Sequence, residues 1–394
     1  MLDLGLLPLA NRLPASATDP EERFPLVVVV CHDCRLVQLD HAISPATIFA
    51  DYPYFSSCST SWVEHARRFA LSAVPRLSLG PSSLVIEVAS NDGYLLRHFQ
   101  AAGIPVLGIE PSETVAAAAR AIGIPTDGRY FGAATARSLR DQGRVPDLVV
   151  ANNVLAHVPD LDDFLAGLAL LLEPGGVLSC EFPHLLRLID GVQFDTIYHE
   201  HFSYFSLLSL ERAMGRHGLV VVDAEELATH GGSLRLWVRR GGRAASVAPS
   251  PVLDRVRMAE QAAGLAQDKV YDGFAARVRD CIADLRRFLD QAGAGGRRVA
   301  AYGAAAKGAT LLGACGATIR DIAFVADVNP RKQGRHLPGT GIPIAPPQRI
   351  FAEKPDLVLI LPWNLSNEIM TQLAGIREWG GRFAVPIPRV TELP

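Results

Sequence analysis

Lysine is scarce in this chain, because only four of its 38 basic residues are lysines and the rest are arginines. Net charge is also small, since 41 acidic residues leave a formal balance of −3. A chain without an overall basic excess lacks the electrostatic signature of a nucleic-acid-binding protein and of a polybasic membrane anchor. We therefore expect neither a nucleic acid nor a membrane as its partner.

Long apolar runs and a dense set of cysteines are missing as well. No stretch approaches the ~18 apolar residues of a membrane-spanning helix, and the N-terminus lacks the basic-then-apolar pattern of a signal peptide. Six cysteines among 394 residues do not form a disulfide scaffold. The length suits two or three domains, and 49% hydrophobic residues supply ample core. These features predict a globular, cytoplasmic protein.

Residues 1–66 predict a small, irregular unit that carries half of a metal site. An apolar strand over 24–30 leads into Cys31-His32-Asp33-Cys34, and such a knuckle supplies two of the four ligands of a structural zinc ion. No second pair lies nearby, so zinc is a candidate cofactor with half of its site missing. A redox-active pair is the alternative. The opening from Leu2 begins in mid-pattern, which suggests that a preceding Cys-x-x-Cys is absent from this version of the chain.

A buried strand over 83–88, a tight turn and a helix then follow, the arrangement that brings backbone close to a ligand at a helix N-terminus. The turn resembles the first motif of class I S-adenosylmethionine methyltransferases, with Ala89 and Asn91 where glycine is commoner. The next strand ends in Glu110, about 20 residues on, which suits the two hydroxyls of a ribose. Glu87 is expected to place the methionine end of the donor or the turn itself.

Later landmarks strengthen this interpretation. A strand over 147–151 ends in two amides, a Pro-Gly-Gly turn leads into a fifth strand that ends near Glu181, and 219–223 with 233–239 predict a closing antiparallel pair. A dehydrogenase-type Rossmann domain would carry a fuller Gly-x-Gly-x-x-Gly. The residues expected to contact S-adenosylmethionine are Glu87, Ala89, Ser90, Asn91, Asp92, Gly93, Glu110, Pro111, Asn152 and Asn153.

The densest chemistry lies in residues 196–206, which include Tyr198, His199, Glu200 and His201. Polar and aromatic residues fall on every face, so neither helical nor strand periodicity accounts for the mixture. Groups that hold or move a proton at this density indicate general acid–base chemistry. The alternative is a loop whose histidines only satisfy buried backbone groups.

The last third predicts a second Rossmann-like unit after one or two amphipathic helices over 252–292. A strand over 298–302 enters a turn from Gly303 to Gly308, whose helix-N-terminal amides would be open to a phosphate. Lys307, Lys332 and Arg335 are the candidates for binding a diphosphate. A purely structural turn is the alternative.

With these motifs in place, the chain resembles the sugar C-methyltransferases of antibiotic deoxysugar biosynthesis nearly from end to end. The likeness runs through Cys31-x-x-Cys34, Tyr-Phe-Ser-Ser, Glu-Val-Ala-Ser-Asn-Asp-Gly, Tyr-His-Glu-His-Phe-Ser-Tyr-Phe and Tyr-Gly-Ala-x-Ala-Lys-Gly. It implies an α/β fold in three parts: an N-terminal zinc-type domain (1–66), a class I methyl-donor domain of Rossmann-like fold (67–245), and a helical linker with a C-terminal Rossmann-like domain (246–394). It also implies methyl transfer from S-adenosylmethionine to C3 of a 4-keto-deoxysugar linked to a nucleotide such as dTDP.

The resemblance further implies residue roles. His201 would remove the proton next to the ketone, while Tyr198 and Glu200 would orient that base or the keto oxygen; His199 is the alternative base. The expected substrate contacts are Tyr52, Tyr54, Asn153 and His157, together with Lys307, Lys332 and Arg335. Two other functions stay open: an O- or N-methyltransferase acting on a small acceptor, and a non-catalytic nucleotide-sugar-binding protein.

Overall fold

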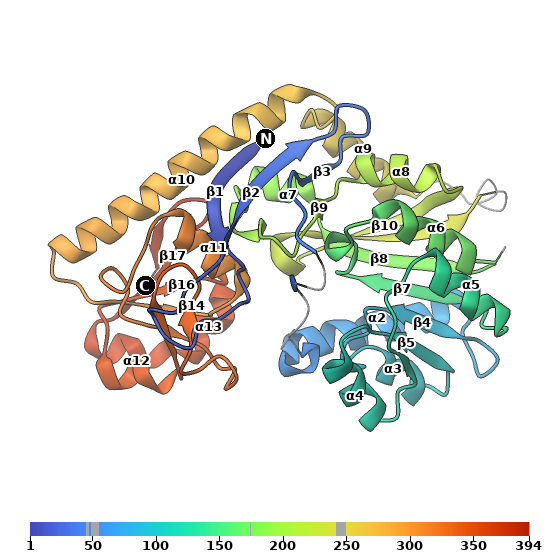
Figure 1. Ribbon diagram of the computed structural model, residues 1–394, viewed down its shortest axis with the longest axis horizontal. Coiled ribbons are helices and arrows are strands. Elements are labelled where there is room, and N and C mark those ends of the chain that lie inside the picture. Colours follow the sequence, from blue (N-terminus) through green and yellow to red (C-terminus); the bar gives the residue numbers. More distant parts are fainter. Residues whose placement is uncertain (45–46, 49–54, 174, 242–249, 394) are drawn as a thin grey trace.

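The computed structural model describes residues 1–44, 47–48, 55–173, 175–241 and 250–393 (Figure 1). Its strands form three sheets, which we name the N-terminal sheet (β1-β2-β3-β9), the central sheet (β10-β11-β8-β7-β4-β5-β6) and the C-terminal sheet (β14-β15-β13-β12-β16-β17-β18). One small sheet therefore accompanies two Rossmann-like sheets, as the sequence predicts. Within the described ranges, no helix has the length and apolar character needed to cross a membrane.

The N-terminal sheet contains a strand from the middle of the chain. β1, β2 and β3 pair antiparallel in order, and β3 then pairs with β9, with Val37 opposite Tyr204. Because β9 follows directly after Tyr198–His201, this pairing fixes that cluster against the N-terminal unit. The strands are β1 (Leu2–Pro8), β2 (Arg23–Val30), β3 (Val37–Leu39) and β9 (Ser203–Tyr204).

Five parallel strands make up most of the central sheet, and an antiparallel hairpin closes it at β8. The chain reverses its direction across the sheet between β4 and β7, and open α/β sheets bind ligands outside the strand ends at such a point. The strands are β4 (Val85–Val88), β5 (Val106–Ile109), β6 (Thr126–Asp127), β7 (Leu148–Asn152), β8 (Val177–Pro183), β10 (Leu219–Leu227) and β11 (Ser233–Arg240).

Helix α2 (Thr60–Leu77) runs across residue 66, where the sequence predicts a domain boundary, and it packs on the central sheet. Ser59 caps its first turn, and Phe69 packs against Trp237 of β11 with ring centroids 5.9 Å apart. The other helical segments here are η1 (Ser56–Cys58), α3 (Leu96–Ala101), α4 (Glu113–Ala121), α5 (Ala133–Asp141), η2 (Leu155–His157), α6 (Leu161–Leu171), α7 (Leu185–Asp190), η3 (Phe194–Thr196), α8 (Leu207–Gly215) and η4 (Thr229–Gly231).

The C-terminal sheet has parallel strands in the order β15-β13-β12-β16-β17, with β14 and β18 antiparallel at its edges. Its reversal point lies between β12 and β16. The strands are β12 (Val299–Tyr302), β13 (Val325–Ala326), β14 (His336–Leu337), β15 (Ile342–Ala345), β16 (Leu357–Ile360), β17 (Arg382–Val385) and β18 (Thr391–Leu393). The helical segments are α11 (Ala306–Ala314), α12 (Gln348–Glu353), η6 (Trp363–Leu365), α13 (Ser366–Gln372) and η7 (Ala374–Trp379).

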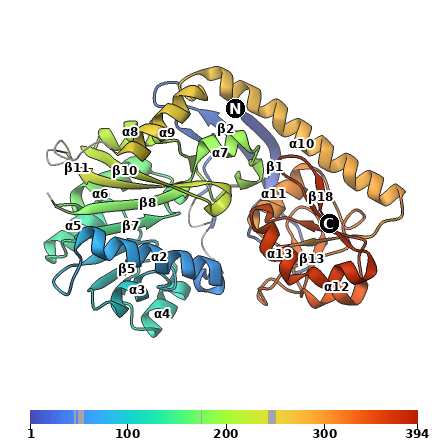
Figure 2. The same ribbon diagram turned by 180° about the vertical axis from the view of Figure 1, so that it is seen from behind.

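Two helices, α9 (Pro251–Ala262) and the 27-residue α10 (Asp268–Ala294), join the central and C-terminal sheets. Both ribbon views show α10 running beside β1 and β2 toward the C-terminal sheet (Figures 1 and 2). One hydrophobic core combines side chains of α10, the N-terminal sheet, α7 and the C-terminal sheet. The residues that α10 buries recur every three or four positions, as one helical face requires: Tyr271, Phe274, Val278, Cys281, Leu285, Leu289 and Ala292.

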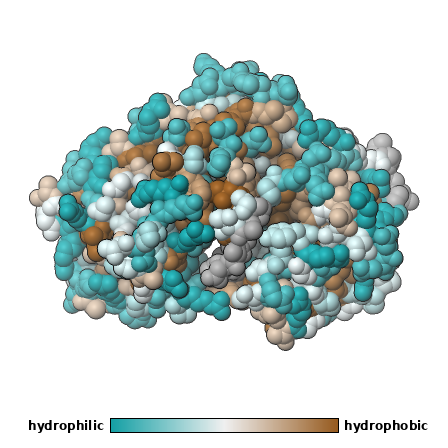
Figure 3. All heavy atoms as spheres, in the orientation of Figure 1, coloured by the Kyte–Doolittle hydropathy of each residue, from teal (hydrophilic) through white to brown (hydrophobic). Residues whose placement is uncertain are grey.

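Apolar side chains also reach the surface over this junction. Figure 3 shows them gathered in the upper middle of the face, where β1 and β2 lie in Figure 1. A shallow groove there is lined by both strands and by the neighbouring face of α10, including Leu4, Val28 and Ile282.

Candidate active site

The turn after β4 has the backbone that the donor motif requires. Ala89, Asn91 and Gly93 all adopt positive φ, at 57°, 49° and 77°. Glycine adopts this region without strain, which explains why the family motif favours it at positions that alanine and asparagine hold here. A Cβ on Gly108 of β5 would lie 2.3 Å from the hydroxyl oxygen of Ser90, so the neighbouring strand approaches this turn closely.

Several buried polar atoms around this turn have no partner among the described residues: Glu87 Oε2, Asp92 Oδ1 and Asn152 Oδ1. Burial, with the nearby carboxylates of Glu110 and Asp92, raises the pKa of Glu87 well above its ordinary value. Buried polar atoms are normally hydrogen-bonded, so unpaired acceptors at a strand end point to a ligand that carries donors. The ammonium and ribose hydroxyls of S-adenosylmethionine fit such a set of acceptors.

Glu110 holds the same turn together. Its two carboxylate oxygens accept hydrogen bonds from the backbone amides of Asn91 (3.0 Å) and Ser112 (2.8 Å). Burial nevertheless raises its pKa. Because each carboxylate oxygen has two lone pairs, a contact to a ribose remains compatible with these bonds.

Asp127 ends β6 opposite Ile109, the residue before Glu110, and the sequence prediction missed it. The hydrogen bond from Arg129 lowers the pKa of its carboxyl and keeps it ionised. A strand of two residues has no detectable periodicity, so only the neighbouring strand reveals this second acid at the edge of the sheet.

The segment 55–58 covers the donor turn from the outside. The amide of Ser56 donates to Asn91 Oδ1 (2.8 Å), and the amide of Ser57 donates to Asp92 Oδ2 (3.1 Å). Phe55 also contacts the unit of the C-terminal sheet, because the Arg331 guanidinium lies 4.4 Å from the centroid of the Phe55 ring. Tyr52 and Tyr54, the expected substrate contacts just before this segment, lie outside the described residues.

The four residues from Tyr198 to His201 divide into two pairs. His199 and Glu200 are buried, whereas Tyr198 and His201 keep part of their surface open. The Tyr198 hydroxyl lies 2.8 Å from His201 Nε2, and their ring centroids are 4.0 Å apart. His201 Nδ1 lies 2.9 Å from the Thr196 carbonyl, which can only accept, so Nδ1 carries the proton and Nε2 the lone pair.

Burial is the main reason that the pKa of His201 lies well below its ordinary value, and the neighbouring His157 lowers it further. The His157 ring meets His201 edge to face at 4.8 Å, and its Nδ1 lies 2.8 Å from the Glu200 carbonyl. Burial likewise lowers the pKa of His157 to about 4. Both imidazoles are therefore neutral at pH 7, the form in which an imidazole can accept a proton.

Asn153 comes immediately after β7, in the segment that leads to His157. Its backbone is left-handed (φ 53°), and neither atom of its side-chain amide has a partner in the described structure. A strained backbone with an unpaired buried side chain is typical of a functional position. The structure thus brings Asn153, His157, Tyr198 and His201 to one end of the central sheet.

His199 and Glu200 point into the N-terminal unit instead. His199 Nε2 lies 3.3 Å from the Phe24 carbonyl, and the two rings meet edge to face at 6.0 Å. Asn11 donates to Glu200 Oε1 at 3.1 Å, while Oε2 is unpaired and burial raises the pKa of this carboxyl. These two residues join the cluster to β2 and to the segment after β1.

Two expected diphosphate ligands lie where the C-terminal sheet reverses. Lys307 Nζ donates to Asn364 Oδ1 (3.3 Å) and lies 5.0 Å from the centroid of the Trp363 ring. Lys332 donates to the Ala304 carbonyl (2.8 Å) and so supports the turn after β12. The third, Arg335, is exposed and lies against the N-terminal segment, 3.4 Å from the Leu13 carbonyl.

Asp195 lies between the two Rossmann-like sheets, and the sequence prediction missed it. It is fully buried; Trp363 Nε1 donates to its Oδ2 (2.7 Å), while Oδ1 is unpaired. Burial raises its pKa to about 6, and Lys307 opposes that rise. The segment η3 that carries Asp195 packs on α11, so the C-terminal end of the central sheet faces that of the C-terminal sheet.

Cys31 and Cys34 lie in the turn between β2 and β3, and their thiols face one another closely enough to influence each other's pKa. Among the described residues, no group of three or more His, Cys, Asp or Glu is placed to hold a metal ion. Two thiols alone do not fit a closed structural zinc site, which needs four ligands. An ion pair from Arg35 to Asp268 of α10 and a hydrogen bond from Arg212 to the Asp33 carbonyl (2.7 Å) hold the turn.

Three family descriptions match the chain: putative zinc binding domain over 1–49, methyltransferase domain over 62–224, and C-methyltransferase C-terminal domain over 228–388. The C-methyltransferase NovU of Streptomyces niveus is 38% identical over 390 residues, which cover 98% of this chain and 92% of NovU. A ubiquinone biosynthesis O-methyltransferase of Rhizobium rhizogenes is 33% identical over 98 residues, covering 24% of this chain and 38% of that protein.

Solved methyltransferase structures overlap about half of the chain. Magnesium protoporphyrin IX methyltransferase (ChlM) from Synechocystis PCC 6803, with bound SAM, has a TM-score of 0.36 and 17% identity, covering 51% of this chain and 100% of that one. An S-adenosylmethionine-dependent methyltransferase from Mesorhizobium loti has a TM-score of 0.35 and 16% identity, covering 45% and 100%. The match to NovU, in contrast, spans all three sheets.

Proposed function

The chain belongs to the family of S-adenosylmethionine-dependent C-methyltransferases, and we propose that it methylates the carbon next to the ketone, C3, of a nucleotide-linked 4-keto-deoxysugar. The observation that carries this proposal is the Tyr198–His201 pair, which keeps part of its surface open and meets the His157 ring edge to face. Carbon alkylation needs such a base to remove the carbon-bound proton. Methylation of an oxygen depends less on a base, because the oxygen already has a free lone pair.

His201 is the proposed base. A carbon-bound proton next to a ketone is a weak acid, so the enzyme must place an acceptor at the proton and donors at the oxygen that gains charge. The Nδ1–H of His201 is held by the Thr196 carbonyl, which leaves the lone pair at Nε2, beside the Tyr198 hydroxyl, to accept a proton. When the acceptor binds, the Tyr198 hydroxyl that now bonds this nitrogen can turn to the keto oxygen.

Asn153 is the proposed second donor for the enolate oxygen, because neither atom of its side-chain amide has a partner among the described residues. His157 is neutral and gives its Nδ1 proton to the Glu200 carbonyl, so it lines this side of the site without donating to the enolate. The methyl donor, S-adenosylmethionine, supplies an electrophilic methyl group on a sulfonium. Glu87, Asp92 and Asn152 would hold it so that this group lies in line with the nucleophilic carbon, which accelerates transfer chiefly through proximity.

The nucleotide part of the acceptor is proposed to extend toward the C-terminal sheet. Lys307 and the turn after Gly303 lie at its reversal point, on the side that faces Asp195 of η3. A substrate that reaches from His201 to Lys307 would span both lobes. This explains why a family of carbon methyltransferases would keep a second Rossmann-like unit that does not hold the methyl donor.

The test is a turnover assay with S-adenosylmethionine and a panel of nucleotide-linked 4-keto-deoxysugars, read by mass spectrometry of the products. We expect a gain of one methyl group on a sugar carbon, and deuterium incorporation at that carbon in heavy water without the methyl donor. His201→Asn should abolish both. His217→Asn is the matched control, because this histidine lies just after α8 and is bonded to Asp162, outside the cluster. Methylation of an oxygen or nitrogen, or exchange retained in His201→Asn, would refute the proposal.

A further inference from the structure

His230 occupies a strained position in η4, the turn that joins β10 to β11. Its backbone is left-handed, with φ 55° and ψ 21°, and Gly231 and Gly232 that follow also have positive φ. A non-glycine residue held in this region is strained and persists only where its surroundings enforce it. Such positions cluster at ligand sites.

The two glycines show that this turn is pressed between other elements. A Cβ on Gly231 would lie 2.4 Å from Cη2 of Trp363, and one on Gly232 would lie 2.6 Å from Cγ of Arg187. Gln193 Nε2 also donates to the Gly231 carbonyl at 2.9 Å. The turn is therefore fixed against η6 of the C-terminal lobe on one side and α7 on the other.

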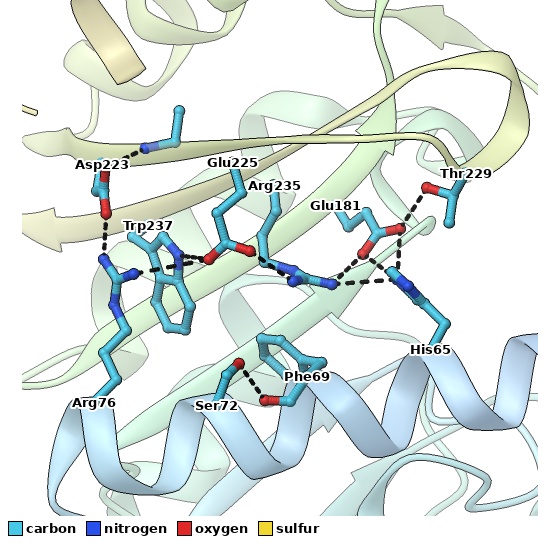
Figure 4. Close-up of polar contacts among 11 residues, drawn as sticks. His65, Phe69, Ser72, Arg76, Glu181, Asp223, Glu225, Thr229, Arg235 and Trp237 are labelled. Carbon is cyan, nitrogen blue, oxygen red and sulfur yellow. Dashed lines mark hydrogen bonds and ion pairs between the residues drawn. The ribbon is translucent and has the colours of Figure 1, made fainter. Parts of the chain in front are cut away.

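A buried ionic network holds the turn from beneath. The Thr229 hydroxyl donates to Glu181 Oε1 (3.1 Å), and Glu181 also accepts from His65 of α2 (2.8 Å) and from Arg235 of β11 (2.6 Å) (Figure 4). Glu181 is completely buried at the end of β8. Its hydrogen bonds with three different elements set the position of the residue just before His230.

The His230 ring itself remains available. It packs on Trp62 of α2, with centroids 5.2 Å apart, and keeps part of its surface open. Neither ring nitrogen has a hydrogen-bond partner within the part of the chain that the structure describes, although Thr229, Glu181, His65 and Arg235 around it are all bonded. An unbonded imidazole in otherwise satisfied polar surroundings can meet a ligand without breaking an existing contact.

One cationic group lies near this turn on another element: Lys307 of α11 lies over the same Trp363 that Gly231 approaches. His201, in the cluster that follows η3, is neutral at pH 7. Glu181 and His65, the remaining ionisable groups around it, are bonded to each other. Burial and then Lys307 lower the pKa of His230 to about 4, so it is a neutral donor at pH 7 in a region that favours an anion.

We propose that His230 contacts the substrate and, together with Lys307, donates a hydrogen bond to a phosphate of the nucleotide-linked acceptor. This inference rests on the proposed function. It assigns part of the recognition of the nucleotide to a residue of the central sheet, the sheet that would also hold the methyl donor. Lys307 then contributes the charge and His230 the direction, because a point-like ammonium orients an anion poorly whereas an imidazole N–H is directional. A phosphate beside His230 favours its protonated form, so binding takes up protons at mildly acidic pH.

The test is calorimetry on the full chain with thymidine diphosphate and, separately, with S-adenosylhomocysteine. His230→Asn should weaken thymidine diphosphate binding about tenfold, equal to about 1.4 kcal/mol, and leave S-adenosylhomocysteine binding unchanged. Proton uptake at pH 6, measured in buffers of different ionisation enthalpy, should shrink in the variant. His217→Asn is again the control.

A second variant separates contact from a structural role. His230→Gly keeps the positive φ without strain, so the chain should stay as stable as the wild type or become more stable, yet it should bind thymidine diphosphate as weakly as His230→Asn. If both variants bind it like the wild type, or lose S-adenosylhomocysteine binding equally, the inference is wrong and the proposed function is untouched. If the wild type itself binds no nucleoside diphosphate, the proposed substrate class fails and this inference with it.

Discussion

The hydroxyl of Tyr198 lies 2.8 Å from Nε2 of His201, with the two rings 4.0 Å apart. The two residues between them in the sequence, His199 and Glu200, are buried against the N-terminal unit. Under the proposed function, the open imidazole of His201 takes part in the chemistry and the buried imidazole of His199 in packing. The Tyr198 phenol is then the group that can exchange its partner, His201, for the substrate.

Replacing Tyr198 with phenylalanine should therefore lower kcat far more than it changes KM. Removing a donor that acts on a developing oxyanion typically costs 10²–10³-fold in kcat, on the order of 3–4 kcal/mol. Steady-state kinetics with the sugar nucleotide would measure it. Tyr130→Phe is the control, since that side chain is 59% exposed and distant from the cluster in sequence. An unchanged kcat in Tyr198→Phe would remove this residue from the mechanism.

Acid should destabilise the protein in part through His157. Its folded pKa of about 4 lies below the unfolded value near 6.5, so the unfolded state binds more protons between these two values. The contribution of His157 to the free energy of unfolding is then complete above pH 6.5 and falls as the pH drops toward 4. Urea unfolding at pH 7 and pH 5 would show it.

The comparison must be made between variants, because Asp195 acts in the opposite direction. Its pKa is raised to about 6, so its protonation favours the folded state as the pH falls through the same window. The loss of unfolding free energy between pH 7 and pH 5 should therefore be smaller in His157→Asn than in the wild type. An equal loss in both proteins would show that His157 does not titrate as described.

Neutralising Glu181 should be severe. Glu181→Gln removes the charge that compensates the buried Arg235, and breaking a buried ion pair on one side typically costs about 3–5 kcal/mol. Thermal and urea unfolding would measure the change. Glu64→Gln, on the exposed face of α2, is the control. It should change neither the thermal nor the urea midpoint, because the ion pair of Glu64 with Arg67 is open to solvent. Equal effects in both variants would contradict the network of Figure 4.

Ala89→Gly should stabilise the chain. The residue sits at φ 57°, where alanine is strained by roughly 1 kcal/mol and glycine is not. Ala102→Gly, just after α3 and without positive φ, should be neutral or destabilising. Differential scanning calorimetry would resolve the two shifts. A lower melting temperature in Ala89→Gly would show that the turn gains something from the alanine side chain that outweighs its backbone strain.

Much of the fold was predictable because it depends on local patterns. The strand, turn and helix around Glu87, the closing hairpin of β10 and β11, and the two helices after residue 250 all appear where hydrophobic spacing places them. The sequence also showed that Ala89 and Asn91 hold positions where the family motif favours glycine. Only their positive φ values explain that preference.

Other features depend on contacts between segments far apart in the chain. β9 joins the N-terminal sheet through Val37 and Tyr204, and Asp195 meets Trp363, which follows it by 168 residues. Asp127 stands at the end of a strand too short to have a pattern. No local spacing in the sequence encodes such pairings, because they depend on how the units of the three sheets pack on one another.

The amino-acid sequence by itself determined the order of the elements, the family resemblance and the stretch that holds the proton-moving groups, because periodicity and short motifs are properties of neighbouring residues. Tertiary structure decided which of those groups are open. It turned His201 toward His157 and His199 toward Phe24, and it brought Lys307 and Gly231, the neighbour of His230, to the same indole of Trp363. Side-chain direction in an irregular segment has no period of its own; it is set by the surfaces that pack against that segment.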